Sequence, residues 1–163
     1  MTVREAVYSL LREFGLTTVF GNPGSTELPM FRDFPADFRY VLGLQESVVV
    51  AMADGFAQAR GDAALINLHS AIGVGHGLGS IFTAFKNHSE QAAQLPKPYV
   101  KWSIEPARAT DVPAAIARAY YVAMQPPRGP AFVSIPVDDW DRPCSPPARN
   151  RGRRSGGARR CLG

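Results

Sequence analysis

The chain has 163 residues, of which 45% are hydrophobic and 20% are charged, a balance that suits one soluble globular domain. It contains no apolar run long enough to cross a membrane and no signal peptide, so we expect a cytoplasmic protein. The two cysteines, Cys144 and Cys161, both fall near the C-terminus, which argues against a disulfide framework and against a metal site.

The charge divides the chain near residue 141. Residues 1–141 hold all 14 acidic residues and 11 of the 18 basic ones, whereas residues 142–163 hold seven arginines and no acid, so their net charges are −3 and +7. The second part has little to bury, and we expect a packed domain followed by a disordered arginine-rich tail. Because no aromatic residue is interleaved with the arginines for base stacking, nucleic acid is not favoured as a partner.

The first third of the chain predicts a helix, a strand and a tight loop. A capping box at Thr2 and Glu5 begins an amphipathic helix that ends at Gly15. Residues 17–20 are β-branched or aromatic and predict a buried strand, which runs into a glycine- and proline-containing loop over residues 21–27.

Residues 40–44 predict a second strand, and a largely apolar helix follows from residue 46 to about residue 60. Glu46 therefore falls at the start of a buried helix, at the mouth of an apolar slot. Burial of a carboxylate is costly, so we expect a raised pKa. The alternative is that Glu46 only complements the positive end of its own helix.

Residues 63–69 predict a third strand, and a glycine-rich turn over residues 70–79 opens a helix that reaches about residue 87. Repeated strands and helices of this kind predict an α/β fold with a parallel sheet, whose functional groups lie at the carboxyl ends of the strands. Ser25, Glu46 and His69 each follow such an end, so we expect them to converge.

The alternation breaks after residue 88, because residues 89–96 are polar where a strand is due. Residues 97–102 predict an extended segment, residues 112–124 a helix, and residues 131–135 a last strand. We therefore expect a sheet that lacks one inner strand.

Several chemical motifs are absent or ambiguous. The glycines of residues 73–79 fit neither G-x-G-x-x-G nor a P-loop, so we interpret them as positions where a helix packs closely on a strand. His69 is either a proton donor and acceptor or a satisfied structural group. The other histidines lack ligand spacing with it, so no metal is expected, and the absence of a G-x-S-x-G elbow argues against a hydrolase.

Several stretches together resemble the N-terminal pyrimidine-binding domain of thiamin-diphosphate-dependent 2-oxo acid decarboxylases, and among these the benzoylformate decarboxylases. They are Val19-Phe20-Gly21-Asn22-Pro23-Gly24-Ser25, Leu44-Gln45-Glu46, Ala53-Asp54-Gly55-Phe56-Ala57, Asn67-Leu68-His69-Ser70, and residues 34–40, 101–103 and 137–141. The resemblance covers about residues 2–141 and implies a three-layer α/β/α fold.

The resemblance also implies roles for individual residues. Glu46 would hydrogen-bond the ring nitrogen of the aminopyrimidine of thiamin diphosphate and favour the tautomer that removes the thiazolium proton. Ser25 would contact the substrate carboxylate and His69 would relay protons. Pro23 and Gly24 would belong to the loop beside the cofactor and substrate.

The chain departs from this family in three places. The Gly-Asp-Gly motif that holds Mg²⁺ and the diphosphate is missing, residues 89–95 look internally shortened, and the arginine-rich end does not continue into a middle domain. We therefore expect a fragment that is inactive alone, with its Mg²⁺ site on the missing domain, and a family that forms homo-oligomers.

The alternatives are a fragment of an acetolactate-synthase-like carboligase and a non-catalytic protein with a basic interaction tail. The pair His69-Ser70 favours the decarboxylase.

Overall fold

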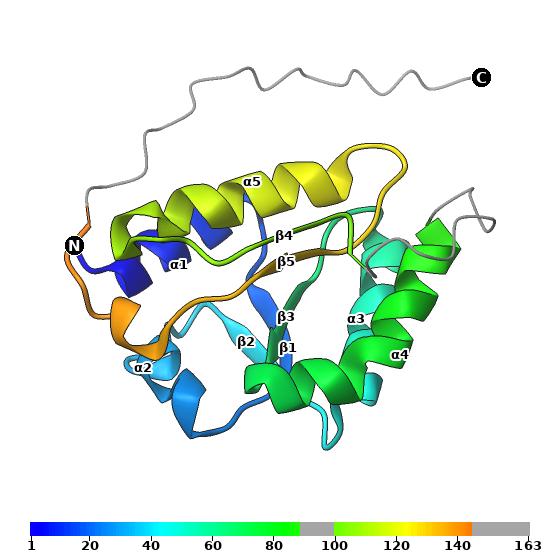
Figure 1. The fold of residues 1–163 in the computed structure, drawn as a ribbon, viewed down its shortest axis with the longest axis horizontal. Helices are drawn as coiled ribbons and strands as arrows, with labels where there is room; N and C mark the ends of the chain where they lie inside the picture. Colours follow the sequence, from blue (N-terminus) through cyan, green and yellow to red (C-terminus); the bar gives the residue numbers. More distant parts are fainter. Residues whose placement is uncertain (89–99, 145–163) are drawn as a thin grey trace.

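The computed structural model describes residues 1–88 and 100–144, and these form helices around parallel strands (Figure 1). In chain order the helices and strands are α1 (Val3–Glu13), β1 (Thr18–Asn22), α2 (Leu28–Phe31), β2 (Arg39–Leu42), α3 (Glu46–Arg60), β3 (Leu65–Leu68), α4 (Ser70–His88), β4 (Trp102–Ile104), α5 (Val112–Met124) and β5 (Ala131–Val133), with short 3-10 turns at Ser25–Glu27, Ala109–Asp111 and Val137–Asp139.

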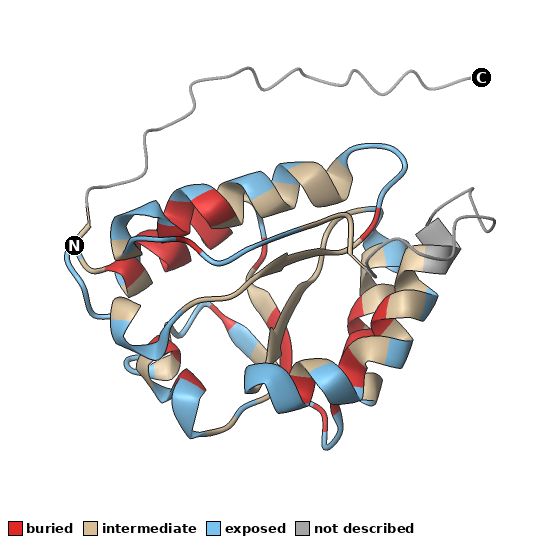
Figure 2. Cartoon of the chain, viewed as in Figure 1, coloured by how far each residue is buried: buried red, intermediate tan, exposed pale blue. Residues whose placement is uncertain are grey.

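The described strands form two parallel sheets. The first has the order β2-β1-β3, with Val19 opposite both Tyr40 and Leu65, and the second joins β4 to β5. The predicted α/β fold with parallel strands is therefore confirmed. All inner residues of β1 are buried, whereas all four residues of β3 are half-buried (Figure 2).

Helices cover both faces of the larger sheet. On one face, Val19 and Leu65 pack with apolar side chains of α1 and α5, including Leu11 and Val112. On the other face, Phe20 packs against α3, which in turn packs along α4. This arrangement gives the three layers, and it places the carboxyl ends of β1 and β3 beside the starts of α3 and α4.

The sequence placed most elements within one to three residues, but it missed the start of α4. The predicted glycine-rich turn over residues 70–79 is helical from Ser70 onward. Glycines lower helix propensity, so the sequence pattern reads as a loop, but packing against α3 overrides that preference. The predicted capping box of α1 is confirmed, with Glu5 N–H 3.2 Å from the Thr2 hydroxyl and Thr2 N–H 2.8 Å from the Glu5 carboxylate.

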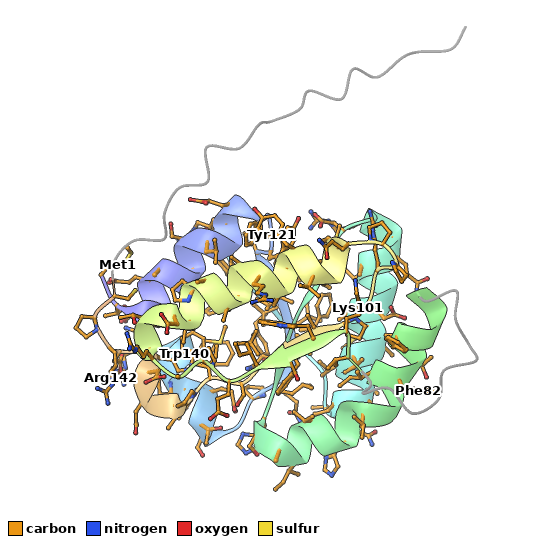
Figure 3. The ribbon with its side chains drawn as sticks, turned by 45° about the horizontal axis from the view of Figure 1, so that its top comes forward. Met1, Phe82, Lys101, Tyr121, Trp140 and Arg142 are labelled. Carbon is orange, nitrogen blue, oxygen red and sulfur yellow. The ribbon has the colours of Figure 1, made fainter. Side chains whose placement is uncertain are left out.

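The C-terminal segment returns to the start of the chain. Backbone hydrogen bonds of 2.9 Å join Val3 to the carbonyl of Arg142 and Arg4 to the carbonyl of Trp140. Figure 3 labels Met1, Trp140 and Arg142 at this end of the molecule. A further backbone hydrogen bond of 3.0 Å joins Cys144 to the carbonyl of Met1. The rest of the predicted tail, residues 145–163, and most of the predicted irregularity at residues 89–96 lie outside the described residues. In the described part of the chain, no helix has the length and apolar character of a membrane span.

Candidate active site

Glu46 lies where β1, α3 and α4 meet. It is the first residue of α3, and its side chain is only 9% exposed. Nδ2 of Asn22, at the end of β1, donates to Oε1 over 3.2 Å, and Nδ1 of His76 in α4 lies 3.3 Å from Oε2. Because an ionised carboxylate only accepts hydrogen bonds, Nδ1 of His76 carries the hydrogen of this contact.

The expected rise in the pKa of Glu46 is wrong. The backbone N–H at the start of α3 lowers this pKa most, and hydrogen bonds from His76 and Asn22 add to the effect, so together they outweigh the opposing effect of burial. The carboxyl group is therefore ionised near neutral pH. Burial could be read from the apolar sequence around Glu46, whereas both hydrogen-bonding side chains come from other elements.

His69 belongs to a second cluster at the same end of the sheet. Its Nδ1 lies 2.8 Å from Oε2 of Glu27 and 3.1 Å from the hydroxyl of Thr26. The same Oε2 accepts the N–H of Gly24 over 2.7 Å, and Thr26 donates to Oε1 over 2.6 Å. Since Nδ1 is the donor to a carboxylate, Nε2 of His69 is left to accept or release a proton.

Glu27 is a buried carboxylate that sequence reasoning missed. Burial raises its pKa, but hydrogen bonds from Thr26, the Gly24 N–H and His69 together bring the pKa below its ordinary value of 4.5. Glu27 is therefore ionised and holds the His69 ring in one orientation. The available sequence signal was the three-residue spacing of Gly24 and Glu27, because the Glu27 carboxylate accepts the Gly24 N–H as the glutamate of a capping box does.

Ser25, Gly24 and Pro23 line an apolar cavity of about 590 Å³ beside this cluster. The remaining lining residues are Leu28, Phe31, Phe34 and Tyr40. Gly24 forms the wall between the cavity and His69, because a Cβ atom at Gly24 would lie 2.3 Å from the imidazole ring. Only a residue without a side chain fits at this position.

The structure thus brings the three predicted residues to one end of the sheet. Glu46 and His69 flank Gly73, where a Cβ atom would lie 3.4 Å from Oε1 of Glu46 and 3.5 Å from Cβ of His69. Ser25 is exposed on the other side of Gly24, and the structure gives it no direct contact with Glu46. Ser70, which follows His69, has a φ of 47°, an uncommon left-handed conformation for a residue other than glycine.

Within residues 1–88 and 100–144, no three His, Cys, Asp or Glu side chains gather as a metal site would require. The acid-base groups of the site are therefore two ionised, hydrogen-bonded carboxylates, each with a histidine beside it, around a glycine-lined surface.

Comparison with known proteins shows what this arrangement resembles. Residues 1–90 match the family described as thiamine pyrophosphate enzyme, N-terminal TPP binding domain. A benzoylformate decarboxylase from Pseudomonas aeruginosa is 51% identical over 164 aligned residues, which cover 87% of this chain and 31% of that protein. An acetolactate synthase large subunit from Haemophilus influenzae is 27% identical over 157 residues, which cover 82% of this chain and 27% of that protein.

A solved structure gives the same result at the level of the fold. Benzoylformate decarboxylase from Polynucleobacter necessarius matches with a TM-score of 0.81 and 44% identity, covering 87% of this chain and 31% of that one. The chain spans less than a third of the length of these three relatives. With more than half of its residues matched by the family description, this chain belongs to the thiamine pyrophosphate enzymes and carries their N-terminal TPP binding domain.

Proposed function

We propose that this chain binds the aminopyrimidine end of thiamin diphosphate and serves as one part of a 2-oxo acid decarboxylase. The observation that carries the proposal is the buried, ionised carboxylate of Glu46 at the bare backbone of Gly73. A carboxyl group of this kind can exchange a proton with a ring nitrogen, and a glycine lets a flat ring approach. The residues present therefore fit the heterocyclic end of the cofactor.

The proposed roles follow from the positions of the side chains. Glu46 would hold the ring nitrogen of the pyrimidine, and Pro23 and Gly24 would shape the adjoining loop. His69, oriented by Glu27, would move protons at Nε2, and Ser25 would contact the carboxylate of the 2-oxo acid. When bound, the cofactor supplies the electron sink for decarboxylation. The higher identity to the benzoylformate decarboxylase than to the acetolactate synthase favours decarboxylation over carboligation.

We propose that the ligands of Mg²⁺ and of the diphosphate lie outside the described residues. Three exposed apolar residues near Glu46 or Gly73 in the sequence, which we call the rim, support a second surface closing over the site: Leu44 is 89% exposed, Ile72 66% and Val48 48%. Exposed apolar side chains of this size are typical of interaction surfaces when they form a contiguous patch. A second copy of this chain would suit the rim, and sedimentation velocity at micromolar concentration would detect it as a dimer.

Thiamin binding to the full chain tests the role of Glu46. We expect thiamin to bind with a Kd of about 1 mM, which NMR titration can measure, and Glu46→Gln to weaken this binding by about tenfold or more. Intact thiamin diphosphate with Mg²⁺ should bind no more tightly than thiamin, because we place the ligands of the diphosphate and Mg²⁺ outside the described residues.

Glu13→Gln is the matched control, since it makes the same substitution at an exposed carboxyl group at the end of α1. It should leave thiamin affinity unchanged. Equal thiamin affinity of the wild-type and Glu46→Gln chains would overturn the role of Glu46, and tight binding of thiamin diphosphate would overturn the placement of the diphosphate site elsewhere.

A further inference from the structure

His76 lies on the face of α4 that packs against Glu46. Gly73, His76 and Gly77 are three and four residues apart, so they share one side of the helix. Cβ atoms at the two glycines would lie 3.4 Å and 3.7 Å from side-chain atoms of Glu46. The glycines thus bring α4 close enough for the imidazole between them to reach the carboxylate.

The contacts of His76 and Asn22 together hold both oxygens of Glu46. Oε1 lies 3.2 Å from Nδ2 of Asn22 and Oε2 lies 3.3 Å from Nδ1 of His76. Two donors from different elements fix the plane of a carboxylate that is itself anchored at a helix start. The His76 side chain is 61% exposed, whereas that of Glu46 is 9% exposed, so the imidazole joins the buried group to solvent.

We propose that His76 is a positioning residue for Glu46: its Nδ1–H fixes Oε2 and keeps the carboxylate oriented toward the pyrimidine site. This inference rests on the proposed function, because it assumes that Glu46 binds the pyrimidine ring of the cofactor. The sequence did not predict this contact. It showed only that the spacing of His76 from the other histidines does not suit a metal site.

The second histidine–carboxylate pair at this end of the sheet is separate from the contact of His76 with Glu46. His69 pairs with Glu27 over 2.8 Å, and that carboxylate accepts its remaining hydrogen bonds from Thr26 and Gly24. Asn22, on β1, does not titrate. In the described part of the chain, the structure shows one ionisable side chain in direct contact with the Glu46 carboxylate, that of His76.

The pKa of Glu46, measured by NMR of its carboxyl carbon in the full chain, tests the positioning contact without any cofactor. We expect His76→Leu to raise this pKa toward the ordinary value, and His76→Gln, which keeps an N–H donor, to leave it close to that of the wild type. Ser80→Ala, one turn further along α4, is the control and should have no effect. Identical Glu46 titration in wild type and His76→Leu would overturn the proposal.

Thiamin affinity of the same variants tests the purpose of the contact. We expect His76→Leu to weaken thiamin binding by about three- to tenfold, the effect of losing one hydrogen bond, and His76→Gln to restore most of it. If Glu46→Gln weakens thiamin binding but His76→Leu does not, the positioning role falls and the proposed function stands. If the wild-type chain does not bind thiamin, the proposed function falls, and the titration of Glu46 still decides whether His76 holds the carboxylate.

Discussion

At the residue scale, each carboxylate of the site accepts hydrogen bonds from side chains of other elements, Glu46 from Asn22 and His76 and Glu27 from His69. Glu46, His69 and Ser25 could be placed because each follows an apolar strand, and parallel strands bring their carboxyl ends to one edge. The pKa of Glu46 is lowered most by the backbone N–H at the start of its own helix, which is the alternative that the sequence left open. The two further donors, Asn22 and His76, could not be foreseen, since they lie 24 and 30 residues away. Glu27 escaped notice because a glutamate in a turn is ordinarily solvated, and its partner His69 lies 42 residues away in the sequence.

Glu27 should make the stability of the chain depend on pH. Its pKa is below the ordinary value in the folded chain, so the stability that it contributes is present above pH 4.5 and is lost as the pH falls through the folded pKa. We expect Glu27→Gln to cost about 1–3 kcal/mol at pH 7, because three donors lose a charged acceptor. The difference from the wild type should shrink toward pH 3.

Urea unfolding between pH 3 and pH 7 measures this difference. Glu13→Gln, at an exposed position, should follow the wild-type curve at every pH. Parallel pH curves for the wild type and Glu27→Gln would show that the buried carboxylate is not held by the His69 cluster.

At the scale of the elements, the spacing of apolar residues predicted the helices well and failed only at the start of α4, which contains several glycines. The predicted helices at residues 46–60 and 112–124 coincide with α3 and α5, because their apolar residues are the ones that pack. Two of the glycines in α4 are close-packing positions, but they pack chiefly against the helix α3, whereas the sequence predicted packing on a strand. Cβ atoms at Gly73 and Gly77 would contact side chains of α3, whereas Cβ atoms at Gly75 and Gly79 would meet no atom within 4 Å. A sequence pattern alone does not distinguish these two sets.

Leucine substitutions at Gly77 and Gly79 should therefore have opposite effects on stability. A Cβ atom at Gly77 would lie 3.3 Å from Cγ2 of Val50, which is 2% exposed, so Gly77→Leu should cost about 1–3 kcal/mol by forcing α3 and α4 apart. Gly79→Leu meets open space and should stabilise the chain by about 0.5–1 kcal/mol through helix propensity. Thermal unfolding of both variants measures the contrast, and a loss of stability in both would mean that the helix spacing is not what the glycines protect.

At the scale of the whole molecule, the division of the strands into two sheets is what a shortened segment near residues 89–95 would produce if that segment had lost a strand. The alignment with the Pseudomonas aeruginosa relative has 164 positions but covers 87% of 163 residues, about 142, so about 22 positions of the relative have no counterpart here. The alignment with the Haemophilus influenzae relative has 157 positions and covers 82% of 163 residues, about 134, so about 23 positions of that relative have no counterpart here. We propose that these positions hold the inner strand that would join β3 to the sheet of β4 and β5.

The half-buried state of β3 and β5 supports this proposal, because inner strands of a parallel sheet are normally covered on both faces. Restoring the segment of about 22 residues from the Pseudomonas aeruginosa relative between residues 88 and 96 should therefore stabilise the chain, since an inserted strand would cover apolar side chains of both sheets. We expect the midpoint of thermal unfolding to rise by at least about 3 °C. An insertion of equal length made of Gly and Ser should lower the midpoint, because it adds loop entropy without burial. If both insertions lowered it equally, the two sheets would be complete as they stand, and the missing positions would belong elsewhere in the chain.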